Sequence, residues 1–371
     1  MEEQKRVPKL RFGEFSGEWE EKKLEDVSKF YDGKRKPIKS SDRAKMQGQY
    51  PYYGASGVID YVNDFIFDDE IVLLGEDGEN ILSRNLPLAF RVSGKCWVNN
   101  HAHVIKPKKH YDVDFLALTL ENVNYQKYNT GTAQPKLNQE VCSKIKCFYP
   151  SFSEQQKIAS FLSAVDKKIT QLQQKQRLLE AYKKGVMQRI FSQELRFTRE
   201  DGSAYPDWKE QKMRDVAPLQ RGFDLPTSKI IEGDYPVVYS NGILRKHKEF
   251  KVNAPGVITG RSGTIGQVTY INEKFWPHNT SLWVTDFKGN YPKFIYYLYH
   301  FFKLERFNAG STVPTLNRND VHAVKKHIPI RPEQTQIAHF LSAIDIKIAV
   351  VESQIEQTQQ FKKGLLQQMF A

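Results

Sequence analysis

The stretch Glu154-Gln-Gln-Lys-Ile-Ala-Ser-Phe-Leu-Ser-Ala-Val-Asp166 occurs a second time in this chain, as Glu333-Gln-Thr-Gln-Ile-Ala-His-Phe-Leu-Ser-Ala-Ile-Asp345. The two copies lie 179 positions apart and are identical at nine of thirteen positions. The similarity extends upstream, at offsets that grow to 189, as far as Trp19 and Trp208. Solenoid repeats have only 20–50 residues, so each copy of this longer unit should hold its own core. The 371 residues are therefore predicted to form one unit of about 180 residues, present twice.

Each copy of this stretch begins a long amphipathic helix. Apolar residues recur there with the 4-3 alternation of a coiled coil. The predicted core positions are Ile158, Leu162, Val165, Ile169, Leu172 and Leu179 in the first helix, and Ile337, Leu341, Ile344, Ile348, Val351 and Ile355 in the second. A helix of at least 33 residues, roughly 50 Å long, needs a cover for its apolar stripe. We expect the two helices to pair as an antiparallel coiled coil; the alternative is that each folds against its own globule.

The rest of each copy shows the pattern of an α+β globule. Short apolar runs separated by Gly, Asn and Pro favour strands joined by tight turns, and the residues 113–128 and 292–307 look helical. The fold class is therefore α+β, with two related globules separated by two long helices and an internal pseudo-two-fold repeat. The predicted parts are a first globule at 1–151, a central helix at 152–195, a second globule at 196–331 and a C-terminal helix at 332–371.

Composition limits the possible compartments and chemistries. No apolar run approaches the roughly 18 residues of a membrane span, the N-terminus lacks the apolar stretch of a secretory signal, and three cysteines indicate a reducing setting. We expect a cytoplasmic protein. We find no phosphate-binding loop, nucleophile elbow or amino-methyltransferase motif. The pairs Cys142/Cys147 and His101/His103 have no counterpart in the other copy, which argues against a zinc site. We predict no catalytic residue, no metal and no cofactor in this chain.

The net charge of +12 suggests a polyanionic partner. The four parts carry net charges of +1, +4, +8 and −1, so the second globule holds most of the excess. Basic clusters accompanied by Tyr, Ser and Asn can neutralise phosphates and contact base edges. The predicted DNA-binding residues are Lys34, Arg35, Lys36, Lys39, Arg43, Tyr52, Tyr53 and Ser56 in the first globule, and Arg221, Tyr239, Asn241, Arg245, Lys246, Lys248 and Arg261 in the second. The alternative for any one of them is a solvated surface residue.

Three motifs resemble the specificity (S) subunit of type I restriction–modification systems. They are Pro8-Lys-Leu-Arg-Phe12, echoed by Leu195-Arg-Phe197; Gly131-Thr-Ala-Gln-Pro-Lys-Leu137, echoed by Gly310-Ser-Thr-Val-Pro-Thr-Leu316; and the Glu-Gln-x-x-Ile-Ala-x-Phe-Leu motif that begins at Glu154 and at Glu333. The resemblance covers essentially the whole chain.

The resemblance implies that each globule is a target recognition domain for one half of a split, asymmetric DNA sequence, with the helices setting the spacing between halves. It also implies a non-catalytic subunit that binds double-stranded DNA and docks two methyltransferase subunits, with two restriction subunits in the full complex. The partner subunits would use S-adenosylmethionine, and ATP with Mg for restriction. One alternative is the recognition subunit of a related system with nuclease and methyltransferase fused. Others are a stand-alone nuclease, an RNA-binding protein, or a structural protein that dimerises through the coiled coil.

Overall fold

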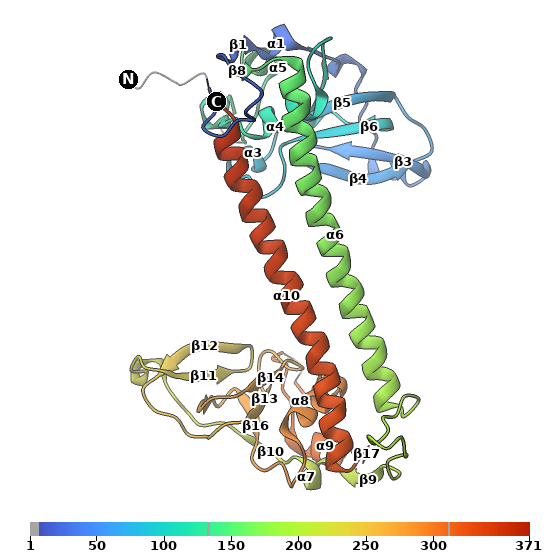
Figure 1. Cartoon of the computed structure of the whole chain (residues 1–371), viewed down its shortest axis with the longest axis vertical. Helices are drawn as coiled ribbons and strands as arrows, with labels where there is room; N and C mark the ends of the chain where they lie inside the picture. The colour runs from blue at the N-terminus through green and yellow to red at the C-terminus, as the bar shows by residue number, and fades with distance from the viewer. Residues whose placement is uncertain (1–6, 132–133, 311) are drawn as a thin grey trace. The chain divides into compact units, whose positions relative to one another are not determined.

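The computed structural model describes residues 7–131, 134–310 and 312–371. The chain forms two compact units: unit 1 contains the residues up to Leu172 and those from Gln354 onwards, and unit 2 is Gln173–Ser353. The long helices α6 (Phe152–Phe191) and α10 (Arg331–Met369) therefore each contribute a segment to both units (Figure 1). The predicted parts follow the chain, with each long helix as a part of its own, whereas the compact units divide each helix between them.

Unit 1 is built on a six-stranded sheet with strand order β2-β7-β5-β6-β3-β4, and β1 pairs with β8 in a second, two-stranded sheet. Helix α4 packs against β5 and β6. The strands are β1 (Glu20–Lys23), β2 (Ser28–Phe30), β3 (Gln47–Gly54), β4 (Gly57–Val62), β5 (Phe67–Gly75), β6 (Ala89–Val98), β7 (Ala102–Pro107) and β8 (Lys146–Tyr149). The helices are α1 (Leu24–Val27), α2 (Ser40–Arg43), α3 (Asn80–Ser83), α4 (Val113–Glu121) and α5 (Gln139–Ser143).

Unit 2 repeats this plan with one strand interrupted. In unit 1, β6 pairs with β5 and then runs parallel to β3, where Tyr52 faces Trp97. In unit 2 the same path is divided into β14, beside β13, and β15, where Trp276 faces Val237 of β11. The sheets are therefore β10-β16-β13-β14, β12-β11-β15 and β17-β9. The strands are β9 (Lys209–Lys212), β10 (Leu219–Arg221), β11 (Tyr235–Tyr239), β12 (Gly242–His247), β13 (Gly256–Gly260), β14 (Val268–Ile271), β15 (Trp276–Pro277), β16 (Ser281–Val284) and β17 (Lys325–Ile328), and the helices are α7 (Met213–Val216), α8 (Pro292–Phe301) and α9 (Arg318–Ala323).

The two long helices run antiparallel. In unit 2, Gln176 Nε2 donates to Glu352 Oε1 at 2.9 Å, and Lys183 pairs with Asp345 at 2.5 Å. Between these two pairs the position on α6 advances by seven residues and that on α10 retreats by seven. In unit 1, Lys362 pairs with Asp166 at 2.6 Å, which is the repeat counterpart of the Lys183–Asp345 pair. The α+β fold class with an antiparallel helix pair is thus confirmed.

The outer turns of both helices also belong to the cores of the units. Ile158, Leu162 and Val165 pack into the unit 1 core together with Leu365 and Met369 of α10. Likewise Ile337, Leu341 and Ile344 pack into the unit 2 core with Val186 and Ile190 of α6. Leu172 and Val351 are buried but lie in neither cluster, and Ile169, Leu179, Ile348 and Ile355 are partly buried. The apolar stripe therefore both joins the two helices and completes the cores, because near each globule its residues face the globule as well as the other helix.

The two predicted helical stretches are shorter than expected. Residues 113–128 form α4 and then a separate 3-10 turn at Tyr125–Tyr128, which begins where the Asn124 side chain accepts a hydrogen bond from Gln126 N. Residues 292–307 form α8 and a 3-10 turn at Leu304–Phe307, because Lys303 adopts a left-handed conformation with φ of 50°. In unit 1 the Asn124 side chain thus caps a new turn and does not continue the helix.

Candidate nucleic-acid interface

The two Gly-x-x-x-Pro-x-Leu loops share one backbone arrangement, held by an asparagine just before each loop. In unit 1, Asn129 Oδ1 accepts hydrogen bonds from Gly131 N at 3.0 Å and Lys136 N at 2.9 Å. In unit 2, Asn308 Oδ1 accepts from Gly310 N and Thr315 N, both at 3.0 Å. The motif positions Thr132, Ala133 and Ser311 lie outside the described residues. One side chain therefore fixes each loop at both ends.

Each of these loops is bound to a Gly-x-x-Gly turn of its own unit, Gly75-Glu-Asp-Gly78 in unit 1 and Gly260-Arg-Ser-Gly263 in unit 2. In unit 1, Gly78 N donates to Pro135 O at 3.1 Å and Leu137 N donates to Glu76 O at 2.7 Å. In unit 2, the equivalent bonds join Gly263 N to Pro314 O at 2.9 Å and Leu316 N to Arg261 O at 2.8 Å. The sequence shows both motifs but not that they form one surface. The side chains between the two glycines are thus presented on a fixed backbone, and they differ between the units.

A third segment next to each turn carries opposite charges in the two units. Unit 1 has Asp32-Gly-Lys-Arg35 where unit 2 has Arg221-Gly-Phe-Asp224, 189 positions later. Their strands confirm the equivalence, since Phe30 faces Ile105 and Leu219 faces Val284, the repeat counterpart of Ile105. Arg35 pairs with Glu76 at 2.6 Å and with Asp32 at 3.5 Å, and its side chain is only 13% exposed. Arg35 was predicted to contact DNA, but the structure uses it inside unit 1.

His103 completes this ionic cluster in unit 1. Its Nδ1 lies 2.6 Å from Asp32 Oδ2 and its Nε2 lies 2.8 Å from Leu137 O. Both neighbours are acceptors, so both ring nitrogens must donate and the ring carries a positive charge. Burial alone would lower the pKa of His103, but its interactions with Asp32 and Cys142 raise it to about 10. The cluster joins β7, the Asp32 turn and the Gly-x-x-x-Pro-x-Leu loop.

Unit 2 leaves the corresponding cations accessible. Arg221 pairs with Asp224 at 2.9 Å, yet half of its side chain is exposed. Arg261 takes the position of Glu76, and its Nη1 donates to Asn279 O at 3.2 Å. Leu282 stands where unit 1 has His103. The turn surface is therefore self-neutralised in unit 1 and offers arginines in unit 2.

The β3–β4 hairpin of unit 1 holds several predicted DNA-binding residues in structural roles. Tyr52 is 1% exposed, and its hydroxyl accepts from Ile38 N at 3.0 Å. Arg43 lies over the Tyr52 ring and donates to Asp60 Oδ2 at 3.0 Å. Tyr53 is half-buried against Phe90, and burial raises its pKa. Ser56 is half-buried as well, whereas the predicted cations Lys34, Lys36 and Lys39 are exposed.

The β11–β12 hairpin of unit 2 carries an exposed basic strand. Arg245, Lys246 and Lys248 are exposed, and within the described part of the chain none of them has an ion-pair partner. Their neighbours Ile243 and Leu244 are also largely exposed. Asn241 is exposed at the hairpin turn, whereas Tyr239 is half-buried beside His278, and burial raises its pKa. Strand β12 pairs only with β11, so this row of side chains lies on a sheet edge.

The Glu-Gln motif that begins each long helix serves the architecture. Glu154 accepts hydrogen bonds from Arg11 at 2.8 and 2.7 Å, and Glu333 binds Arg196 in the same way at 2.8 and 3.1 Å. The glutamine that follows ties the helix to the globule: Gln155 Oε1 accepts from Asp112 N at 3.0 Å. The recurring Arg of the Leu-Arg-Phe motifs therefore pairs with the recurring Glu. These contacts give the strongest repeat in the sequence an architectural role.

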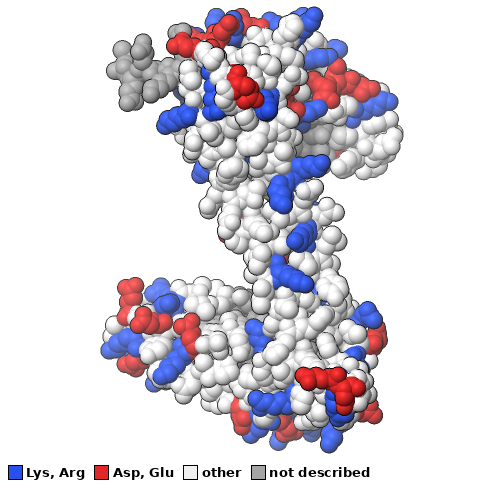
Figure 2. Space-filling model, in the orientation of Figure 1, with Lys and Arg blue, Asp and Glu red and all other residues white. Residues whose placement is uncertain are grey.

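The visible face of each unit carries mixed charge. Figure 2 shows Lys and Arg next to Asp and Glu over both globules, whereas the charged side chains visible along the exposed stretch of the long helices are almost all Lys and Arg. Numerous carboxylates on unit 1 pair with nearby cations, among them Glu70 with Arg91 at 2.5 Å and Asp69 with Lys106 at 2.5 Å. Because the charge on both globules is mixed, any contact of these faces to a polyanion must rely on local groups of cations.

Among the described helices, none is both long and apolar enough to cross a membrane.

Comparisons with known proteins agree with this architecture. The family model described as type I restriction modification DNA specificity domain matches the chain twice, at residues 16–181 and 205–360. The chain is 29% identical to a Haemophilus influenzae protein whose name assigns it to the type I restriction enzyme specificity subunits, over 88% of this chain and 87% of that protein. It is 22% identical to the type I restriction enzyme MjaVIII specificity subunit of Methanocaldococcus jannaschii, over 94% of this chain and 91% of that protein. The crystal structure of an S subunit from M. genitalium has the same fold, with a TM-score of 0.68 at 13% identity, over 98% of this chain and 99% of that one.

Proposed function

The chain belongs to the type I restriction–modification DNA specificity family, and on this premise we propose how its two units divide the reading of a DNA target. The protein is a non-catalytic DNA-recognition subunit, and the alternative with a fused nuclease and methyltransferase is not favoured. Each unit reads one half of an asymmetric bipartite sequence. The observation that supports this division is the shared loop frame of the two units, which carries Glu76 in unit 1 and Arg261 in unit 2.

In unit 2, we assign base reading to the turn arginines. Arg261 has both its backbone N–H and its carbonyl fixed by hydrogen bonds, to Thr280 O and from Leu316 N. A side chain on a fixed backbone can approach a base edge in a defined direction, and Arg is the commonest partner of guanine in the major groove. Arg221 lies on the neighbouring segment and is half-exposed. Arg245, Lys246 and Lys248 lie on the hairpin edge, and we assign them to phosphate contacts. Such contacts position the protein on the duplex but do not read the base sequence.

In unit 1, the exposed cations Lys34, Lys36 and Lys39 are assigned to phosphate contacts. The paired cluster of Asp32, Arg35, Glu76 and His103 keeps the turn surface close to neutral. We therefore expect unit 1 to gain less of its affinity from charge and unit 2 to gain more. Each phosphate contact releases counterions and adds to the salt dependence of the affinity. Binding of unit 1 to its half-site should therefore depend less on salt than binding of unit 2.

The family implies assembly with modification and restriction subunits, and we propose two docking positions for modification subunits, one on each long helix. Lys183-Lys-Gly185 on α6 recurs as Lys362-Lys-Gly364 on α10. Neither glycine has any non-local atom within 4 Å of the place where a Cβ would stand. Glycine inside a helix costs about 1 kcal/mol relative to alanine. The folded chain has room for a side chain at both positions, so nothing within it requires glycine there. We attribute both glycines to the close approach of a partner subunit.

The catalytic cofactors belong to those partners in this proposal. The modification subunits would use S-adenosylmethionine to methylate adenine, and restriction subunits would use ATP with Mg. Two copies of the modification subunit follow from the two docking positions, and we propose two restriction subunits in the full complex as well. A complex that methylates chromosomal DNA works in the cytoplasm, which is the compartment we propose for this chain.

Two sets of variants test the division of roles when assembled with modification subunits. Arg261→Ala should relax or change the sequence of one half-site and leave the other half unchanged. Arg245→Ala with Lys246→Ala should weaken binding about equally for all sequences and leave the methylated motif unchanged. A changed motif in the double variant, or an unchanged motif in Arg261→Ala, would contradict these assignments.

A further inference from the structure

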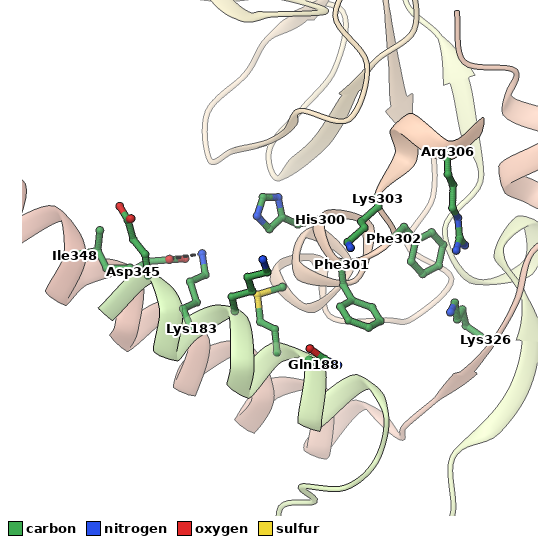
Figure 3. Close-up of a pocket in the computed structure, with 13 residues that line it drawn as sticks. Lys183, Gln188, His300, Phe301, Phe302, Lys303, Arg306, Lys326, Asp345 and Ile348 are labelled. Atoms are coloured by element: carbon green, nitrogen blue, oxygen red, sulfur yellow. Dashed lines mark ion pairs between the residues drawn. The ribbon is translucent and has the colours of Figure 1, made fainter. Parts of the chain in front are cut away.

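Unit 2 contains a cavity of about 760 Å³ bounded by α6, the C-terminal end of α8, β17 and α10 (Figure 3). At one end Lys183 and Asp345 form an ion pair. At the other end lie Lys303, Arg306 and Lys326, beside the rings of Phe301 and Phe302. A cavity of this volume is in the range that holds small-molecule ligands.

The three cations at the second end lack carboxylate partners. Lys303 and Arg306 are exposed and Lys326 is half-buried, and no ion pair to any of them is found across the residues that the structure describes. Lys326 Nζ lies 5.3 Å from the ring centroid of Phe302 and 6.0 Å from that of Phe301. The acidic residues that line the cavity, Glu180 and Asp345, come from the long helices, and Asp345 is bound to Lys183 and to the Tyr297 hydroxyl.

This arrangement leaves like charges close together on a partly apolar surface. Burial lowers the pKa of Lys326, and the positive charge of Arg306 lowers it further. A cation that is partly desolvated and repelled by its neighbour is stabilised when an anion joins the pair. The guanidinium of Arg306 offers paired donors with the geometry of phosphate oxygens, while the lysines add point charges.

The repeat provides a comparison within the same chain. The positions of Lys303, Arg306 and Lys326 correspond, 179 residues earlier, to Asn124, Lys127 and Cys147. These three residues also line a cavity in unit 1, but that cavity has only about 150 Å³ and a single one of these positions is cationic. The shared scaffold therefore does not require the cation group, and it is a separate property of unit 2.

We propose that the cavity of unit 2 binds a phosphate-bearing anion between Lys303, Arg306 and Lys326. Two sources offer this chemistry: a free pyrophosphate or nucleoside polyphosphate, and the backbone of a bound nucleic acid. The site is independent of the assignments for target reading, since none of its residues lies in the turns or hairpins that carry them.

The test uses the full chain and two measurements. The first is calorimetric titration with inorganic pyrophosphate of the wild type, of Arg306→Gln with Lys326→Gln, and of the matched unit 1 control Lys127→Gln. We expect one pyrophosphate per chain, at least tenfold weaker binding in the double variant and no change in the control. The exposed Lys303→Gln is a milder variant that should weaken binding severalfold, and equal thermal unfolding temperatures show that each variant is folded.

The second measurement is the salt dependence of binding to a duplex of unrelated sequence. If the phosphate backbone of nucleic acid is the source, the plot of log K against log salt concentration should be less steep by about 2 in the double variant, since each lost phosphate contact reduces the magnitude of the slope by about 0.9. Either result supports the site and identifies its source. The proposal is overturned if neither quantity changes, or if the double variant loses only its association with a modification subunit, which would identify an acidic protein segment as the occupant.

Discussion

His103 shows at the scale of single residues how unit 1 holds its loops together. One ring contacts the Asp32 carboxylate, the Leu137 carbonyl and, at 3.9 Å, the Glu76 carboxylate. Arg35, which the sequence marks as one of three adjacent cations, is drawn into the same cluster. The adjacency of Lys34-Arg-Lys36 was visible in the sequence, but the pairing was not, because Glu76 lies 41 positions away and only the fold brings it near.

The charge on His103 predicts how the stability of unit 1 depends on pH. Its pKa is raised to about 10 in the folded state from an ordinary value of 6.5. A raised pKa means that the contribution to the free energy of unfolding is complete below pH 6.5 and is lost as pH rises towards 10. Denaturant unfolding at pH 6, 8 and 10 should show this decline, and it should be missing in His103→Leu, which introduces the unit 2 residue.

His103→Leu should also destabilise unit 1 by about 3 kcal/mol at neutral pH, because it removes the cation closest to the buried Asp32 carboxylate and leaves that carboxylate, among the described residues, only Arg35 at 3.5 Å and Val104 N. Lys106→Gln is the matched control on the same strand, since its pair with Asp69 is exposed and should contribute less than about 1 kcal/mol. Equal destabilisation by both variants, or a pH dependence that survives in His103→Leu, would refute the role given to His103.

A second prediction at this scale concerns the first glycine of each Gly-x-x-x-Pro-x-Leu loop. A Cβ at Gly131 would collide with the Gln134 carbonyl oxygen, and one at Gly310 with that of Val313. Gly131→Ala and Gly310→Ala should each lower the free energy of unfolding by about 1–3 kcal/mol, because the new Cβ forces the loop backbone to shift. Gly33→Ala meets no atom within 4 Å and serves as the control. Chemical denaturation that finds all three alike would contradict the fixed loop frame.

At the scale of elements, the long helices are the part that the sequence predicts best. A heptad pattern depends only on local spacing, so the start of α6 and the antiparallel pairing follow from the chain itself. The globules were predicted less completely, because strand order depends on contacts between distant residues. Buried Tyr52 illustrates the limit, since an aromatic residue beside a basic cluster has the same sequence signature whether it faces the core or DNA.

The helices also provide a prediction about assembly. Gly185→Ala with Gly364→Ala should stabilise the isolated chain by about 0.5–1 kcal/mol for each site, because alanine favours the helix and meets open space. The same double variant should bind modification subunits more weakly if partners approach these glycines closely. Unfolding curves and a pull-down titration separate the two effects. Unaltered assembly in a stabilised variant would rule out docking at these positions.

At the scale of the whole molecule, the chain consists of two related units that differ in their presented side chains. The net charge of +12 is unevenly distributed, and the unit 2 globule offers most of the unpaired cations described above. The turn residues Glu76 and Arg261 stand on equivalent backbone and carry opposite charge. Two different surfaces on one scaffold are the basis of our proposal that the two units read two different half-sites.

Single-molecule sequencing of methylated adenines in a host that expresses this chain with its modification subunits tests that claim most directly. We predict a motif of two dissimilar half-sequences separated by a gap of fixed length, with one methylated adenine in each half. Arg261→Ala should change only one of the halves. A contiguous motif, or a palindrome with two identical halves, would contradict the account.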